Sequence, residues 1–119
     1  MGGREVRIRE AIKRAGDIRP GTTEERLKYA WVYELEGKVA ELMGVDVPAN
    51  GWPEDAELLM PYPYDNIYEL YIAAMTDYFN DETDTYANDM TVFNTAYSEA
   101  AAWYRRNHRP KDSGRWLTL

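Results

Sequence analysis

Four stretches of the chain place apolar residues at helical spacing, and the first of them covers residues 4–15. Its apolar positions are Val6, Ile8, Ile12 and Ala15. They form one apolar side among arginines, lysines and glutamates, which is typical of an amphipathic helix. The pattern therefore predicts a first helix over 4–15, stopped by Gly16 and by the Pro20-Gly21 pair that follows.

The second stretch predicts a helix over 23–43. Thr22 followed three residues later by Glu25 is a capping-box pattern, in which the two side chains satisfy backbone N–H groups at a helix start. Gly44 supplies a left-handed stop, and Gly37 inside the helix indicates either close packing or simple tolerance, at a cost of about 1 kcal/mol relative to alanine. The apolar face comprises Leu27, Trp31, Leu35, Val39 and Leu42.

Residues 44–63 predict a long connection, because prolines and glycines at this density prevent a continuous helix or central strand. Within it, residues 57–60 are expected to form a short extended piece, and Trp52 is expected to fold back over the core. A loop of this length in a small domain is often functional, and binding is favoured over catalysis here.

The third stretch starts at Asp65, which caps or opens a helix that ends near Asn80. Its expected inner face comprises Ile67, Leu70, Tyr71, Ala74 and Tyr78. This periodicity predicts a helix. Because only a short acidic turn follows it, this helix is expected to pack against the next one along the chain.

The fourth stretch predicts the longest helix, over 83–107, ended by Pro110. Its expected stripe comprises Tyr86, Met90, Phe93, Tyr97, Ala100, Ala101 and Tyr104. Arg105, Arg106 and His108 complement the negative end of its dipole. Because only a short turn separates helices three and four, they are expected to form an antiparallel hairpin.

These elements predict an all-α fold, with about four helices in a small bundle. Residues 1–109 are expected to form a single helical domain, since 119 residues suit one hydrophobic core. Residues 110–119 are expected to form a flexible basic and apolar tail, in which Trp116, Leu117 and Leu119 dock on this subunit or on another one.

Charge divides the chain into three parts. Residues 1–31 hold eight Lys/Arg against five Asp/Glu, residues 32–102 hold fifteen acids against Lys38 alone, and residues 103–119 hold five basic residues against Asp112. The net charge of −7 suits an ordinary solvated surface. Alternatively, basic ends meet the acidic flanks of neighbouring copies in a head-to-tail assembly.

The chain has no cysteine, which excludes disulfides and thiolate metal sites. No run of about 18 apolar residues is present, so we expect no membrane span. The charged N-terminus lacks the apolar region of a signal peptide, and a cytosolic protein is therefore expected.

Candidate catalytic chemistry is sparse. The single histidine, His108, lies among arginines at a helix end and is interpreted as a dipole partner. The segment from Asp81 does not place a glycine and a glutamate where an EF-hand requires them. Glu34, Glu41, Asp77 and Glu82 lack a paired E-x-x-E motif that would support a magnesium-dependent hydrolase. We therefore expect no enzyme activity, no metal and no cofactor.

The chain has ten tyrosines and four tryptophans, and these residues are interleaved with acids. That setting disfavours binding to a phosphate backbone, and no sequence-specific nucleic acid is expected. The aromatic residues either fill a core or form a protein interface, where tyrosine, tryptophan and arginine are enriched. The candidate interface residues are Tyr62, Tyr64, Arg105, Arg106, Arg109, Trp116 and Leu117.

The segment AIKRAGDIRPGTTEERLKYAWVYELEGKVAE and the segment from PYPYD to YRRNHRP resemble a family of small proteins from tailed phages and prophages of Gram-positive bacteria, which are identified as head-tail connector (adaptor) proteins. The resemblance covers about residues 6–110. Its most specific pieces are PYD at 63–65 and FNTAY at 93–97, followed by Tyr104, Arg106 and Pro110. The acidic loop 46–57 departs from the family pattern, which leaves the choice of partner open.

The resemblance implies a non-enzymatic virion assembly subunit. Such a subunit joins a ring, commonly twelvefold, beneath the portal, with DNA passing through the lumen. Its partners are further copies of itself in the assembled virion, and the portal or other head-tail proteins; in isolation the subunit is either an oligomer or a monomer. Its place is the host cytoplasm during assembly and then the head-tail interface of the virion. An alternative function is an acidic, DNA-mimicking regulatory or inhibitory module encoded by a prophage. A single exposed stripe of acids would favour that alternative.

Overall fold

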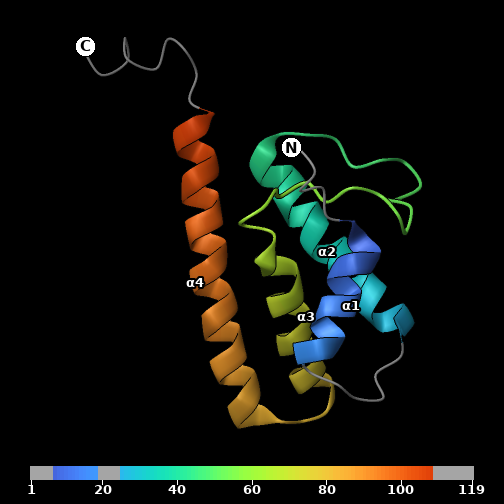
Figure 1. Ribbon diagram of the computed structural model, residues 1–119, viewed down its shortest axis with the longest axis vertical. Coiled ribbons are helices and arrows are strands. Elements are labelled where there is room, and N and C mark those ends of the chain that lie inside the picture. Colours follow the sequence, from blue (N-terminus) through green and yellow to red (C-terminus); the bar gives the residue numbers. More distant parts are fainter. Residues whose placement is uncertain (1–6, 19–24, 109–119) are drawn as a thin grey trace.

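Four helices account for most of the described chain. The structure is a computed structural model that describes residues 7–18 and 25–108. Its helices are α1 (Ile8–Ile18), α2 (Glu25–Met43), α3 (Asn66–Phe79) and α4 (Thr83–Asn107) (Figure 1). The described ranges contain no β-strand, only an isolated antiparallel bridge between Arg7 and Glu57. The all-α class, with about four helices in a small bundle, is confirmed.

Helix α1 begins later than the sequence predicts. Arg7 pairs with Glu57, and the next backbone N–H, from Ile8, donates to the carbonyl oxygen of Ala56 at 3.0 Å. Glu10 then accepts the backbone N–H of Arg7 at 2.9 Å, the acidic half of a capping box. A contact with residues some fifty positions away in the sequence therefore fixes this helix start. Of the short extended piece expected at 57–60, only Glu57 takes part in β-type pairing.

The expected stop at Gly16 is wrong. Helix α1 continues through Gly16 to Ile18, since a glycine in a helix costs only about 1 kcal/mol, which packing of the apolar side offsets. Ile8, Ile12 and Ala15 are buried, as predicted from their spacing. Residues 19–24, with the expected cap at Thr22, lie outside the described residues.

Helix α2 agrees with its prediction from Glu25 onward. Trp31, Leu35 and Val39 are buried, and α2 ends at Met43, followed by Gly44, whose φ of 71° is the expected left-handed conformation. The N–H of Val45 closes this turn on the carbonyl oxygen of Ala40 at 3.0 Å. A Cβ at Gly37 would meet nothing within 4 Å, so this glycine reflects tolerance and not close packing.

Helix α3 is the centre of the bundle, because it contacts the other three helices. Helix α4 packs alongside it in the predicted antiparallel hairpin, on the side away from α1 (Figure 1). The Tyr71 and Phe93 rings meet across this hairpin with centroids 5.0 Å apart. Buried side chains from all four helices and from the loop residues Leu58 and Met60 form one core cluster.

One member of the expected inner face of α3 is outside the core. Ile67, Tyr71 and Ala74 are buried, but Tyr78 is 64% exposed. It lies one residue before the end of α3, where the chain turns toward α4, and the Tyr86 ring, 5.5 Å away, covers it only in part. Burial on α3 therefore stops at Asp77, two residues before the helix ends.

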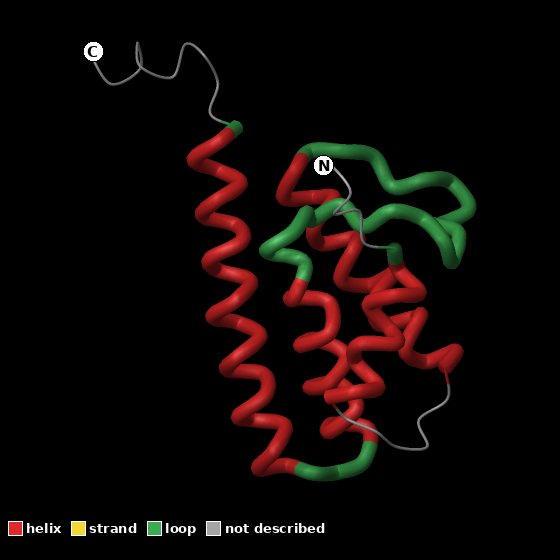
Figure 2. The backbone as a smooth tube through the Cα atoms, viewed as in Figure 1, coloured by secondary structure: helices red, strands yellow, loops and turns green. Residues whose placement is uncertain are grey.

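The long connection between α2 and α3 runs over one end of the bundle (Figure 2). Residues 44–51 are all exposed. The later part returns to the body: Trp52 packs on the core cluster, as predicted, and Leu58 and Met60 are buried. The part of this loop that precedes α3 is thus anchored, whereas the part that follows α2 is not.

Candidate protein interface

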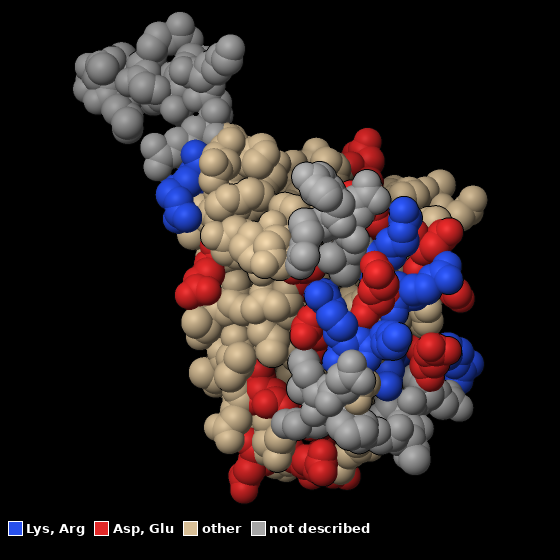
Figure 3. Space-filling view, in the orientation of Figure 1, with Lys and Arg blue, Asp and Glu red and all other residues tan. Residues whose placement is uncertain are grey.

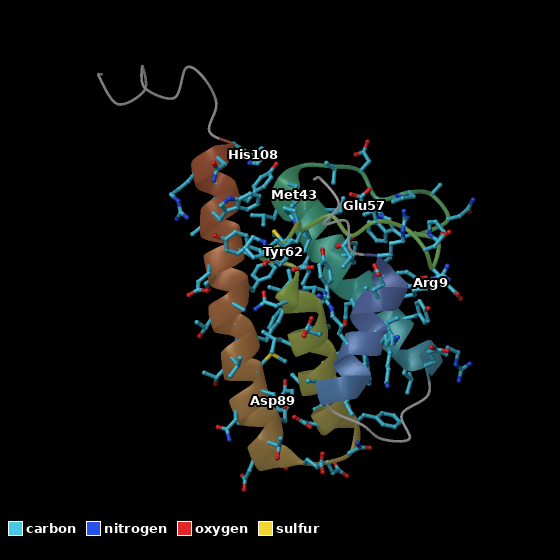
Figure 4. The ribbon with its side chains drawn as sticks, viewed as in Figure 1. Arg9, Met43, Glu57, Tyr62, Asp89 and His108 are labelled. Carbon is cyan, nitrogen blue, oxygen red and sulfur yellow. The ribbon has the colours of Figure 1, made fainter. Side chains whose placement is uncertain are left out.

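Stacked aromatic rings join the C-terminal part of α4 to the loop before α3. The rings of Tyr64 and Trp103 are 5.0 Å apart and inclined by 26°. The hydroxyl of Tyr104 donates to the backbone carbonyl oxygen of Met43 at 3.2 Å. Because of these contacts, the end of α2, the loop at 61–64 and the last turns of α4 meet at one end of the molecule, where Met43, Tyr62 and His108 lie (Figure 4).

His108 belongs to the same group of rings. Its imidazole stacks on Tyr104 with centroids 3.9 Å apart, and it meets the Trp103 ring edge-on with centroids 6.1 Å apart. Its Nδ1 lies 2.9 Å from the carbonyl oxygen of Tyr104, so the ring interacts with the helix end as a dipole partner would. We call Tyr62, Tyr64, Trp103, Tyr104 and His108 the aromatic end.

Exposure and charge make the aromatic end suitable for contact with another protein. Tyr62 is 51% exposed, and its peptide bond to Pro63 is cis. Arg105 and Arg106 are exposed and follow directly after the stacked rings. Val45 and Val47, 44% and 51% exposed, lie just past the carbonyl of Met43. Aromatic and arginine side chains are enriched at protein interfaces.

Four of the seven candidate interface residues lie at this end. The ring stack of Tyr64 on Trp103 brings the segment with Tyr62 beside the segment with Arg105 and Arg106. Arg109, Trp116 and Leu117, with the expected tail at 110–119, lie outside the described residues. Sequence reasoning did not select Trp103, Val45 or Val47. The signal available for Trp103 was its position two residues before an arginine pair.

A second exposed surface lies at the opposite end of α4. Tyr78 is 64% exposed and Phe79 is 58% exposed, and the turn that follows carries the exposed acids Asp81, Glu82 and Asp84. Asp81 has a φ of 59°, in the left-handed region that asparagine and aspartate tolerate best after glycine. We call these five residues the acidic turn. The sequence predicted the turn and its charge but not the exposure of its two aromatic residues.

A buried carboxylate anchors the loop that carries Tyr62. Glu36 of α2 is fully buried; its Oε2 accepts the N–H of Leu59 at 2.8 Å, and its Oε1 accepts the hydroxyl of Tyr68 at 2.5 Å. The Tyr68 hydroxyl in turn accepts the N–H of Met60 at 3.0 Å. Burial raises the pKa of Glu36, and its hydrogen bonds oppose this only in part. This network positions the start of the 61–64 segment.

Asp65 does not cap α3 with its side chain. Its carboxylate, almost fully buried, lies 3.4 Å from Nη2 of Arg14, and Nε of Arg14 lies 3.0 Å from Oε1 of Glu69. The arginine therefore binds two acids of α3 from α1. Burial raises the pKa of Glu69, against the opposite effect of Arg14.

The acids considered for a magnesium site lie in different settings, and Glu41 is exposed on α2. Oε1 of Glu34 accepts the hydroxyl of Tyr71 at 2.7 Å, and Asp77 is fully buried within α3, whereas Glu82 is exposed. Within residues 7–18 and 25–108, no group of three or more metal-ligating side chains comes together.

Basic and acidic side chains are unevenly distributed over the face seen in Figure 3. Lys and Arg gather with Asp and Glu over α1, whereas α4 shows acids toward its start and basic residues at its end, beside the aromatic end. The described helices include none long and apolar enough to cross a membrane.

Comparison of the chain with protein-family models, with characterised proteins and with solved structures finds no match. The class of protein therefore follows from the fold alone: a small all-α helical bundle with an exposed aromatic surface at each end of its longest helix.

Proposed function

We propose that this chain is a non-enzymatic assembly subunit, a head-tail connector (adaptor) of a tailed phage or prophage, which acts through protein–protein interfaces in a ring. The observation that carries this proposal is the pair of exposed aromatic surfaces at opposite ends of α4, with arginines beside one and acids beside the other. A subunit within a ring needs separate surfaces for its neighbours and for the portal. The resemblance of residues 6–110 to connector proteins agrees with this reading.

The aromatic end is the surface proposed for the portal or another head-tail protein. Its rings are held in place by Tyr64 on Trp103 and by the bond of Tyr104 to Met43, so little side-chain entropy remains to be lost on binding. Tyr62, Arg105 and Arg106 then supply exposed contact groups on a rigid base. The proposed location is the host cytoplasm during assembly and the head-tail interface afterwards.

The distribution of acids favours this function over DNA mimicry. In the described residues, exposed acids occur on α2, in the 44–63 loop, in the acidic turn and on α4, whereas Glu36, Asp65 and Asp77 are buried. A mimic of a nucleic acid needs carboxylates in one stripe at phosphate-like spacing. On the face seen in Figure 3, the acids lie over several elements and mix with Lys and Arg over α1, and they do not follow one stripe there.

The test is negative-stain imaging and copurification of the full chain with and without a candidate portal protein. We expect rings seated on the portal. The double variant Arg105→Glu/Arg106→Glu should lose them, whereas Arg9→Glu, an exposed position on α1, should keep them. A chain that stays monomeric at every concentration and does not bind the portal would rule out the connector function.

A further inference from the structure

We propose that residues 109–119 of one copy dock on the acidic turn of a neighbouring copy, as a head-to-tail contact between identical chains. The inference deepens the proposed function, because it names the surfaces through which neighbouring subunits would hold each other. It rests on three observations: two exposed aromatic side chains, the charge on either side of the contact, and the length of α4.

The acidic turn has the composition of a docking surface. Tyr78 and Phe79 are adjacent and both more than half exposed, and Phe79 also touches the Trp31 ring, whose centroid is 6.5 Å away. Exposed apolar surface next to a polar rim is a common mark of an interaction site. The turn beside them carries exposed carboxylates at positions 81, 82 and 84. An occupant should therefore be apolar at its centre and basic around it.

Residues 109–119 have that chemistry. The segment RPKDSGRWLTL carries three basic residues against one acid, and Trp116 and Leu117 follow Arg115 directly. An indole and a leucine beside an arginine match two exposed rings beside carboxylates, in both apolar area and charge. Within the chain's own sequence, this segment is thus complementary to the acidic turn.

The length of α4 favours an intermolecular contact. Helix α4 has 25 residues, which corresponds to about 37 Å at 1.5 Å per residue. The acidic turn lies at its start, and the described chain leaves its end at His108. Trp116 is eight residues further on and reaches about 29 Å at most, even fully extended. In the same copy, the indole would approach Tyr78 and Phe79 only with residues 109–116 fully extended back along α4, whereas a neighbouring copy can present its acidic turn without that constraint.

A contact of this kind is heterologous, since each copy offers its tail to one neighbour and its acidic turn to another. Repetition of such a contact closes into a ring or continues as a filament, depending on the rotation between copies. The two halves of the contact can be disabled separately, which allows a direct test.

The test uses two full-length variants, each lacking one half. The tail variant is Trp116→Ala/Leu117→Ala, and the turn variant is Tyr78→Ser/Glu82→Gln/Asp84→Asn. Val92→Ser is the matched control, since Val92 is 51% exposed in the middle of α4, away from both surfaces. Sedimentation velocity from about 1 to about 500 µM measures association, and circular dichroism checks that each variant keeps its helices.

The wild type and the control should self-associate, more weakly at about 500 mM than at about 50 mM salt, since the charged rim is screened. Each variant alone should associate at least tenfold more weakly. An equimolar mixture should give a heterodimer, because one variant retains the tail and the other retains the turn.

Three outcomes would overturn the docking: a wild type that stays monomeric over the whole range, a tail variant that associates like the wild type, or a mixture that shows no heterodimer. The connector function is judged separately. If the tail variant still forms rings on the portal, the docking is wrong while that function stands. If the mixture forms the heterodimer but neither the wild type nor any variant binds the portal, the docking is supported and the connector function is wrong.

Discussion

The hydroxyl of Tyr68 donates a 2.5 Å hydrogen bond to Oε1 of Glu36, and neither side chain is exposed to solvent. With the N–H groups of Leu59 and Met60, which donate to the same pair, this contact links α2, α3 and the loop between them at one buried point. The arrangement stabilises the fold and also fixes the approach to the aromatic end.

Replacement of Tyr68 by phenylalanine should be strongly destabilising. It removes the donor to Glu36 and leaves the N–H of Met60 and a buried carboxylate oxygen without that hydroxyl. A buried group left unsatisfied costs about 1–3 kcal/mol, and hydrogen bonds to charged groups are worth more than neutral ones. We expect Tyr68→Phe to lower the free energy of unfolding by about 2–4 kcal/mol in urea denaturation.

Tyr71→Phe is the matched control for that substitution. It removes one hydroxyl that donates to Glu34, whose side chain is exposed and can turn to water. The expected cost is about 0.5–1 kcal/mol. Equal costs for the two variants would mean that the Glu36 network contributes no more than an ordinary surface hydrogen bond.

The stability of the protein should carry a signature of Glu36 in its pH dependence. Because burial raises the pKa of this carboxyl, the folded state holds the proton to higher pH than the unfolded chain, whose value is near 4.5. Its stabilising contribution is therefore fully present below pH 4.5 and is lost as the pH rises through the folded-state pKa.

The variant Glu36→Gln isolates this contribution, since Glu69 titrates in the same direction in both proteins. The free energy of unfolding of the wild type minus that of Glu36→Gln should fall as the pH is raised from about 4 to about 7. Urea denaturation at a series of pH values measures it. A difference that grows with pH would show that the hydrogen bonds from Tyr68 and Leu59 outweigh burial.

Arg14 is expected to contribute more to stability than the exposed Arg9. It pairs with Asp65, whose side chain is only 4% exposed, and with Glu69. Arg14→Gln should cost about 2–4 kcal/mol, because it leaves an almost buried carboxylate without its cation. Arg9→Gln is the control: Arg9 and Asp55 are 4.0 Å apart and about 60% exposed, and such pairs contribute little. Thermal unfolding of both variants distinguishes the two cases.

Two glycines should respond to alanine with opposite signs. Gly44→Ala should destabilise by about 1 kcal/mol, because alanine is strained at a φ of 71°. Gly37→Ala should stabilise by up to about 1 kcal/mol, since Gly37 lies in the interior of α2 and its new methyl group meets no neighbour. A destabilised Gly37→Ala would indicate that this helix face has a partner in solution.

The amphipathic patterns predicted α2, α3 and α4 closely, because each of these helices buries a periodic apolar face and ends at a local signal. Gly44 is one such signal, and Asn80 is the C-cap of α3. For α1, the prediction was wrong at both ends, for different reasons. Its start depends on the bridge from Arg7 to Glu57, which no local pattern contains, and its end lies beyond a glycine that tertiary packing tolerates.

The candidate surfaces were only partly predictable from the sequence. Tyr62, Arg105 and Arg106 were selected by residue type, but the stack of Tyr64 on Trp103 that brings their segments together depends on folding. Glu36 was not selected, because a glutamate next to an apolar position in a helix is usually exposed to solvent. Its burial depends on Tyr68 and Leu59, which contact it only in the folded chain. Tyr78 was assigned to the core from periodicity, which does not reveal where neighbouring helices stop covering a face.

The wholly exposed segment 44–51 is a suitable place to attach a probe that reports on the contacts between copies. No buried side chain depends on it, so lengthening it costs mainly loop-closure entropy, about 0.6 kcal/mol for each doubling. Since the chain has no cysteine, Asn50→Cys would introduce a single thiol for a fluorophore or a spin label. The distance from such a probe to its counterpart on an adjoining molecule would report how successive copies are oriented.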